Sequence, residues 1–212
     1  MFAKLLHPLI PALIAVALCG AFPAPANAAL SQEDKDDLAR ISAYLNSITT
    51  LTGKFTQVSS NGSYAEGTFY LKKPGRLRFE YAPPVPLLIV ADGVTVAVTN
   101  NELETQDRYP LGATPLSILL DDDVDLASDD HVTRVERNPG QIAVTASESD
   151  GPAQGEITLV FSDPGLELRH WIVKDAQGAQ VIVAISDTRR GVEISAARFK
   201  IEDVNKLIPH DD

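Results

Sequence analysis

The segment between residues 67 and 93 constrains the fold of this chain more than any other part of the sequence. Leu77, Phe79 and Tyr81 alternate there with charged residues, directly after a Lys-Pro-Gly turn at positions 73–75. A period of two is typical of a β-strand that buries one face and exposes the other. Runs of similar composition stand before the turn and after a following double proline. The segment therefore predicts three consecutive antiparallel strands that share one apolar face.

Short alternating runs, separated by Gly, Pro, Asn and Asp, fill most of the remaining sequence. Pairs such as Asn61-Gly62 and Asp92-Gly93 have the chemistry of hairpin turns, so we expect an antiparallel meander that curls. No internal repeat or low-complexity linker interrupts the chain, which favours a single domain. The predicted strands lie near residues 53–59, 64–73, 76–82, 86–91, 93–99, 102–108, 130–138, 140–147, 155–162, 166–175 and 179–187, with a shorter one near 197–201.

Two segments depart from this pattern and predict helices. Ser31 and the acidic residues after it form an N-cap signal, and apolar residues then recur every three or four positions up to a helix end near Thr50. In residues 114–120, Thr114 is the cap and Pro115 takes the first helical position before an apolar turn and a half. Because this segment is short and apolar, we expect it to lie against the open face of the curled sheet.

The first 28 residues resemble a secretory signal peptide. Lys4 is followed by an apolar stretch at residues 5–18 that contains two prolines, and Ala26-Asn27-Ala28 is a small-x-small cleavage site. We therefore expect residues 1–28 to be cleaved and residues 29–212 to form one exported domain in the periplasm. A retained membrane anchor is disfavoured because the apolar run is shorter than the ~18 residues that a span needs.

Cys19 is the only cysteine of the chain. Lipid attachment at this residue would require a small residue directly before it, and Leu18 is large. We therefore assign Cys19 to the cleaved segment. The mature chain then has no disulfide and must be held together by its core, which roughly 184 residues can supply in a single domain.

The chain is strongly acidic, with 18 Lys and Arg against 29 Asp and Glu and a formal net charge of −11 at pH 7. Cleavage after residue 28 removes one lysine and no acid, which leaves 17 basic residues, 29 acidic residues and a net charge of −12. We therefore expect no nucleic-acid partner. Anionic lipid headgroups also repel such a surface, which favours a protein that travels in solution over one that stays at a membrane.

The sequence carries no recognisable catalytic or metal-binding motif. The acidic run at residues 121–125 places carboxylates at alternate positions, but an EF-hand would need glycine where Leu126 stands and glutamate where Val132 stands. A nucleophile elbow, a mature cysteine nucleophile and a phosphate loop are missing. We therefore expect no catalytic residue, metal or cofactor, although 29 acidic residues leave a catalytic carboxylate pair open. The mature histidines lack zinc-type spacing; they are His131, His170 and His210.

Apolar residues at alternate positions of many strands carry most of the remaining information. Periodicity alone favours an ordinary packed core for these residues. Composition, however, does not distinguish a filled β-barrel from one that encloses a cavity.

The order of motifs along the chain resembles that of the LolA family of periplasmic outer-membrane lipoprotein carriers. Residues 67–93 carry Gly-x-Phe-x-Leu-Lys-Lys-Pro-Gly-x-x-Arg-Phe-x-Tyr, then x-x-Pro and Val-x-Asp-Gly, and Phe55-Thr56-Gln57 and Thr114-Pro115 add to the match. The resemblance weakens after about residue 125. It implies an unclosed antiparallel β-barrel of about 11 strands under an α-helical lid, with an apolar cavity inside. The N-terminal helix and residues 114–120 would form this lid.

The resemblance also implies where a ligand binds and what holds the lid. Members of the family carry an arginine directly before the turn proline, where it bonds to the lid, and this position is Lys73 here. We expect the Lys73 ammonium to reach the lid carbonyls near residues 114–120, or Arg76 or Arg78 to take its place. The implied lipid-binding cavity is lined by Phe55, Phe69, Leu71, Leu77, Phe79, Tyr81, Val96, Leu116 and Leu119.

The implied function is that of a periplasmic carrier. It would bind the acyl chains of lipoproteins from an inner-membrane ABC transporter and deliver them to an outer-membrane receptor, as a monomer without a cofactor. One alternative is a lipid-sensing regulatory or interaction domain of the RseB type, which would need a second domain that this chain is too short to hold. Another is a LolB-like receptor, which is itself lipid-anchored and is disfavoured by Leu18. An enzyme is the weakest alternative.

Overall fold

A computed structural model describes residues 30–114, 116–148 and 154–204. These residues form one antiparallel sheet of 11 strands in the order β6-β5-β4-β3-β2-β1-β11-β10-β9-β8-β7, accompanied by short helices. The outermost strands, β6 and β7, do not pair with each other, so the barrel is unclosed. This confirms the predicted mainly β fold. The predicted signal peptide with Cys19, and also Pro115 and His210, lie outside the described residues.

Two runs of hairpins make up the sheet, and the pairing of β1 with β11 joins them. The meander is interrupted between β6 and β7, where the chain passes through the helix α2. The strands are β1 (Thr50–Ser59), β2 (Tyr64–Lys72), β3 (Arg76–Tyr81), β4 (Leu87–Asp92), β5 (Thr95–Asn100), β6 (Thr105–Pro110), β7 (Val132–Asn138), β8 (Gln141–Glu148), β9 (Gly155–Ser162), β10 (Leu168–Asp175) and β11 (Gln180–Arg190).

Strand β3 has the alternation that the sequence predicts. Leu77 and Phe79 are buried in the hydrophobic core, whereas Arg76, Arg78 and Glu80 between them are partly exposed. Successive side chains of a strand point to opposite faces, so the apolar face of β3 is turned to the concave side of the curled sheet. The charged face is turned to the convex side.

Two glycines of the 67–93 segment are explained by close approach of neighbouring atoms. A Cβ atom on Gly67 would lie 2.0 Å from the carbonyl oxygen of Glu80 and 2.7 Å from the ring of Phe55. Gly75 has a φ of +72°, and a Cβ atom there would lie 2.7 Å from the Cα atom of Gly93. A residue with a side chain would clash at the first position and be strained at the second. The β2–β3 and β4–β5 turns therefore pack directly against each other.

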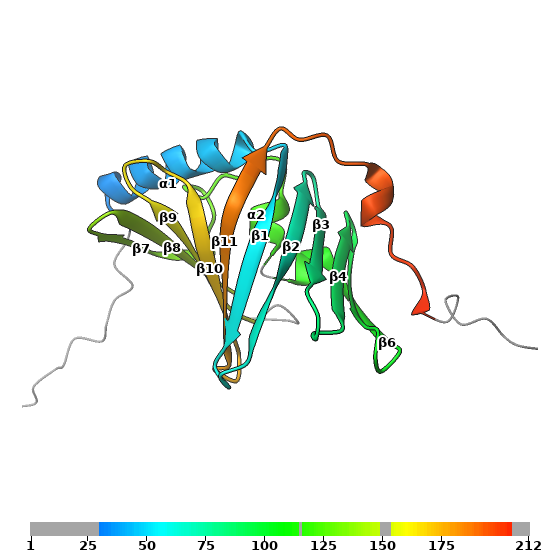
Figure 1. Cartoon of the computed structure of the whole chain (residues 1–212). Coiled ribbons are helices and arrows are strands. Elements are labelled where there is room, and N and C mark those ends of the chain that lie inside the picture. The colour runs from blue at the N-terminus through cyan, green and yellow to red at the C-terminus, as the bar shows by residue number, and fades with distance from the viewer. Residues whose placement is uncertain (1–29, 115, 149–153, 205–212) are drawn as a thin grey trace, which may run out of the picture.

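Helix α1 (Gln32–Asn46) begins at the predicted cap. Ser31 Oγ accepts a hydrogen bond from the backbone N–H of Asp34, and the Asp34 carboxylate accepts one from the backbone N–H of Ser31. The helix ends at Asn46 rather than near Thr50, where β1 begins. Figure 1 shows α1 lying across the half of the sheet that contains β7 to β11. The residues that it buries completely are Leu38, Ile41 and Leu45.

The second predicted helix, at residues 114–120, is shorter than expected, because α2 comprises only Ser117–Leu120 and the 3-10 turn η1 (Leu111–Ala113) precedes it. The predicted cap at Thr114 is wrong, because Leu116 is the N-cap residue of α2 and makes no side-chain capping hydrogen bond. Leu119 and Leu120 are buried, and Leu116 packs against the core at the start of α2. In Figure 1, α2 lies on the same side of the sheet as α1. We call residues 121–126 the lid segment, and α1, α2 and the lid segment together the lid.

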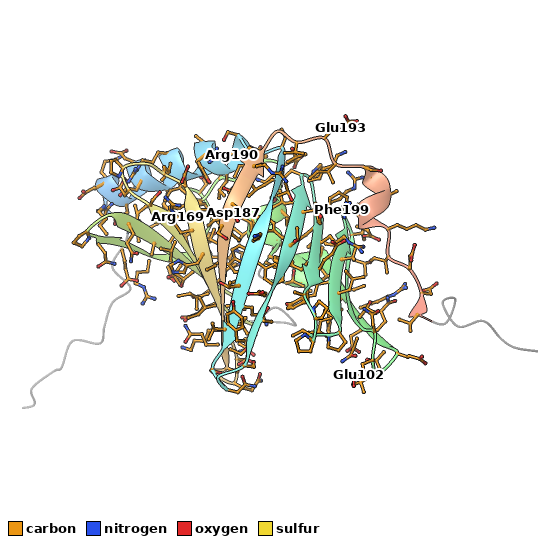
Figure 2. The ribbon with its side chains drawn as sticks, in the orientation of Figure 1. Glu102, Arg169, Asp187, Arg190, Glu193 and Phe199 are labelled. Carbon is orange, nitrogen blue, oxygen red and sulfur yellow. The ribbon has the colours of Figure 1, made fainter. Side chains whose placement is uncertain are left out.

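Residues 191–204, which we call the strap, run over the convex face. The predicted strand at 197–201 is wrong, because residues Ala196–Phe199 form the 3-10 helix η2. Ser195 caps η2 by accepting a hydrogen bond from the Ala197 N–H, and Phe199, labelled in Figure 2, is only 2% exposed. The two-residue spacing of Phe199 and Ile201 resembles a strand, but this segment packs across β3 and β4 instead of extending the sheet.

Candidate functional site

An aromatic cluster fills the middle of the concave face. The ring centroids of Phe55 and Phe79 lie 4.7 Å apart, those of Phe55 and Tyr81 lie 5.0 Å apart, and both pairs meet edge to face. The centroid of Phe79 also lies 6.1 Å from that of Trp171. Such pairs stabilise a core by about 0.5–1.5 kcal/mol each beyond the burial of area. The cluster thereby links β1, β3 and β10.

The structure brings all the residues of the implied cavity into one interior. The lid supplies part of that interior, because Leu38, Ile41 and Leu45 of α1 belong to the same hydrophobic core. In this structure the interior is packed by the protein's own side chains. Of the implied cavity residues, Tyr81 and Leu116 are partly exposed, and the buried ones are Phe55, Phe69, Leu71, Leu77, Phe79, Val96 and Leu119.

Tyr81 places a hydroxyl inside this apolar surface. Its Oη donates a hydrogen bond to Gln57 Oε1 at 2.7 Å. Burial disfavours the phenolate and raises the pKa of Tyr81 to about 12 from its ordinary value of 10.0. Because the pKa is higher in the folded chain than in the unfolded one, the unfolded chain releases this proton first as pH rises.

We expect Tyr81→Phe to change how stability depends on alkaline pH. At pH 8 the variant should be less stable by about 1 kcal/mol, because the Gln57 amide loses its partner. Between pH 8 and pH 11 the free energy of unfolding of wild type should fall by ~1.4 kcal/mol more than that of the variant, since only wild type carries this shifted pKa. The stability advantage of wild type at pH 8 should therefore disappear by pH 11. Urea unfolding across this range measures the difference. A difference that stays constant with pH would contradict the role of burial.

A partly open pocket of about 460 Å³ lies between the lid and the sheet. Its floor is apolar, and most of the residues that form it also belong to the hydrophobic core. Its volume falls within the ~300–1,000 Å³ that is usual for small-molecule sites. The apolar residues of the floor are Ile118 of α2, Val124 and Leu126 of the lid segment, Ala146 of β8 and Ile157 of β9.

Sequence reasoning did not find this pocket, although one signal for it was present. Val124 and Leu126 alternate with Asp123 and Asp125 in the acidic run. The two apolar residues are buried and the two aspartates are exposed. The run therefore contributes two apolar side chains to the core. Sequence reasoning also missed Trp171, which the inward alternation of β10 could have indicated.

Carboxylates surround the mouth of the pocket. Asp121, Asp123, Asp125 and Asp129 line it, and we call these four residues the acidic rim. Asp129 Oδ1 lies 2.7 Å from Nδ1 of His131, which lines the same pocket. In the part of the chain that the structure describes, no lysine or arginine forms an ion pair with the first three. The mouth therefore carries concentrated negative charge above an apolar floor.

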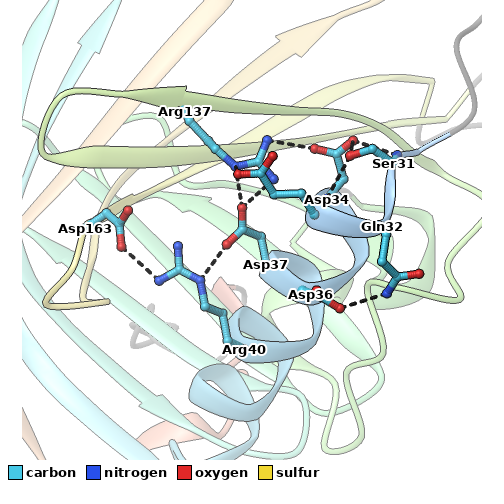
Figure 3. A network of polar contacts seen from close by, with 9 residues as sticks. Ser31, Gln32, Asp34, Asp36, Asp37, Arg40, Arg137 and Asp163 are labelled. Carbon is cyan, nitrogen blue, oxygen red and sulfur yellow. Dashed lines mark hydrogen bonds and ion pairs between the residues drawn. The ribbon is translucent and has the colours of Figure 1, made fainter.

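Helix α1 is held to the sheet by a network of ion pairs (Figure 3). Arg137 of β7 donates to Asp37 at 2.6 Å and to Asp34 at 2.9 Å. Arg40 bridges Asp37 at 2.7 Å and Asp163, beyond the end of β9, at 2.8 Å. Hydrogen bonds from Ser31, and then from Arg137, lower the pKa of Asp34. The pairs are partly exposed, so each contributes little, but together they fix the position of the N-terminal half of α1.

The C-terminal half of α1 holds the lid segment through side-chain amide and hydroxyl groups. Asn46 Nδ2 donates to the carbonyl of Val124 at 3.0 Å, and Asn46 Oδ1 accepts from the Val124 N–H at 2.9 Å. Ser42 Oγ accepts from the Leu126 N–H at 3.0 Å. Residues 124–126 are therefore attached to α1, and through α1 to the sheet.

The turn between β2 and β3 makes the contact with α2. The Gly75 N–H donates to the carbonyl of Leu120 at 2.9 Å. Lys73 Nζ is buried and, among the described residues, has no hydrogen-bond partner, so its expected bonds to lid carbonyls are not formed. Burial lowers the pKa of Lys73, and attraction to Asp121 and Asp122 offsets part of that effect.

The two arginines suggested as substitutes for Lys73 lie on the charged face of β3. Arg78 pairs with Glu80 at 2.6 Å and donates to the carbonyl of Arg198 in the strap at 3.2 Å. Arg198 in turn pairs with Glu80 and stacks over the ring of Tyr70 at 4.1 Å. Arg78 therefore binds the strap on the convex side in this structure. Arg76 is partly exposed on the same face of β3.

We expect Lys73→Met to stabilise the closed chain by about 1 kcal/mol, because it removes a buried ammonium without a hydrogen-bond partner. If Lys73 were hydrogen-bonded to the lid, the same substitution would instead lower the stability. The lowered pKa means that the cost is present while Lys73 is charged and fades as pH rises towards 10.5. Thermal unfolding at pH 7 and pH 10 tests both points. A less stable variant at pH 7 would show that Lys73 holds the lid closed.

No group of three or more His, Cys, Asp or Glu side chains within the described ranges is arranged to hold a metal ion. Among the helices of those ranges, none has the length and apolarity needed to cross a bilayer.

Known proteins resemble this chain in sequence and in fold. The family described as outer membrane lipoprotein carrier protein LolA matches residues 46–202. An outer-membrane lipoprotein carrier protein from Alkalilimnicola ehrlichii is 27% identical over 175 residues, covering 78% of each chain. One from Dechloromonas aromatica is 28% identical over 167 residues, covering 74% of this chain and 79% of its own.

Solved structures show weaker likeness. A LolA superfamily protein from Nitrosomonas europaea matches 77% of this chain and 97% of its own with 10% identity and a TM-score of 0.45. A chain of the Pseudomonas aeruginosa MucA/MucB complex matches over 81% of this chain and 62% of its own length with 16% identity and a TM-score of 0.44.

Proposed function

The chain belongs to the LolA family of outer membrane lipoprotein carriers, and we propose on this basis that it is a periplasmic carrier that binds the acyl chains of lipoproteins non-covalently. Burial of acyl carbons stabilises a complex by ~0.8 kcal/mol per CH2 group, so a lipid-modified protein needs such a carrier to cross water. The single observation that carries the proposal is a lid-covered apolar interior whose core residues also form the floor of a pocket under the lid.

Cargo enters, on this proposal, by displacing part of the lid. Helix α2 is four residues long and is linked to the β2–β3 turn by one backbone hydrogen bond, whereas α1 is tied to the sheet by several ion pairs. Displacement of α2 would join the pocket to the surface formed by Phe55, Phe69, Leu77 and Phe79. The acyl chains would then replace contacts that the closed protein makes with itself.

The same competition explains how a carrier releases its cargo. The empty interior is packed by the protein's own side chains. When cargo leaves and the lid closes, these internal contacts offset part of the free energy lost with the cargo contacts. Binding is therefore weaker than the buried area alone would give. We propose that the chain receives lipoproteins from an inner-membrane ABC transporter and delivers them to an outer-membrane receptor, as a monomer and without catalysis.

Isolation of the chain from the periplasm tests this function. The full sequence would be expressed with a C-terminal tag, purified without detergent, and analysed by intact mass and by lipid analysis. We expect a chain that starts at Ala29 and a sub-stoichiometric amount of co-purified lipoprotein. A diacylglyceryl adduct on Cys19 would contradict the cleaved signal peptide. Periplasmic protein that never carries or takes up lipoprotein from spheroplasts would contradict the carrier function.

A further inference from the structure

The pocket under the lid combines two features that together limit what can occupy it. Its floor contains only hydrocarbon side chains from α2, the lid segment, β8 and β9. Its mouth carries the four carboxylates of the acidic rim, with Ser117, Ser128 and Ser147 between them. A ligand that fits both parts has an apolar tail and a head that tolerates or favours negative surroundings.

The charge of the acidic rim is only partly compensated. His131 lies beside Asp129, and the buried ammonium of Lys73 attracts Asp121 and Asp122. Asp123 and Asp125 are exposed and form no ion pair with any described lysine or arginine. Charges at the mouth of a low-dielectric pocket act on a bound head group within the ~8–10 Å Debye length of physiological salt.

We propose that the acidic rim makes this pocket selective for acyl chains carried on a positively charged head, which for a lipoprotein means basic residues next to the acylated cysteine. The same rim repels phosphatidylglycerol and other anionic phospholipids, whose acyl chains would otherwise fit the same floor. This inference rests on the proposed function and adds the class of cargo to it. It gives the carrier a means of accepting lipid-modified peptides from the transporter in preference to the phospholipids that surround it.

A series of synthetic lipopeptides tests the proposal. Three tripalmitoyl-cysteinyl peptides would carry four lysines, four serines or four glutamates after the cysteine, so that only the charge of the peptide varies. Each would compete with a fluorescent fatty acid for the mature wild-type chain at 20 mM and at 500 mM salt. We expect the lysine peptide to bind about tenfold more tightly than the glutamate peptide at low salt, and this ratio to approach one at high salt.

A matched pair of variants separates the acidic rim from the overall charge. Asp123→Asn with Asp125→Asn keeps the local acceptor oxygens and should reduce the preference to about threefold. Glu102→Gln with Glu104→Gln removes the same charge from the β5–β6 turn, where Figure 2 labels Glu102, and should leave the preference unchanged. Equal loss in both pairs would show a general field instead of a local rim.

The outcomes keep the two proposals apart. If none of the three peptides displaces the probe, the carrier function itself fails. If all three displace it equally at low salt, the carrier function stands and the charge selectivity is overturned. A short-chain phosphatidylglycerol that competes as well as the lysine peptide would also overturn the selectivity, whereas weak competition relative to short-chain phosphatidylcholine would support it.

Discussion

Phe79→Ala is expected to lower the free energy of unfolding by about 3–5 kcal/mol. Phe79 is 5% exposed, and its ring contacts those of Phe55, Phe69 and Trp171. Removal of the ring therefore leaves a cavity at the point where three aromatic side chains meet. Urea or guanidinium unfolding of the mature chain measures the loss directly.

Tyr64→Ala provides a control of matched chemistry, because this ring lies at the start of β2 and is 58% exposed. Its loss should cost no more than about 0.5 kcal/mol, as for other exposed positions. If Phe79→Ala costs as little as the control, the interior is not packed in solution. That result would favour an open cavity at rest and would change the account of how cargo is released.

Much of the fold could be predicted because strand alternation and turn chemistry are local signals. The alternation of Leu77 and Phe79 with charged residues places β3 correctly, and the Lys-Pro-Gly turn marks its start. The cap at Ser31 gives the start of α1 in the same way. Each of these depends on residues within a few positions of one another.

Features that depend on distant partners were not predictable. The strap has strand-like spacing, yet Phe199 is buried across β3 and β4 in a 3-10 helix, and nothing local indicates that contact. The environment of Lys73 depends on residues distant in sequence, among them Asp121 and Asp122, so the absence of a hydrogen bond to Nζ among the described residues could not be predicted from a motif. Val124 and Leu126 belong to the core because Asn46 and Ser42 of α1 hold their backbone.

Ile118→Asp is expected to weaken acyl binding by about a hundredfold, equal to ~2.7 kcal/mol. Ile118 lies on α2 at the floor of the pocket and is only partly buried in the closed protein, so the substitution should leave the fold intact. When an acyl chain lies against this position, an ionised carboxylate must lose water without gaining a partner, which costs far more than the loss of a methyl contact. Displacement of a fluorescent fatty acid measures the affinity.

Two further variants assign the effect to the charge and to the place. Ile118→Asn introduces a side chain of nearly the same shape as aspartate but without its charge, and we expect this variant to lose only about tenfold in affinity. Leu103→Asp puts the same carboxylate on a side chain that is 68% exposed in the β5–β6 turn, where it should not change binding. Wild-type affinity in a folded Ile118→Asp variant would mean that acyl chains reach the aromatic interior without passing over α2. In that case the lid would open on the side of α1, and its ion pairs with Arg40 and Arg137 would have to break during loading.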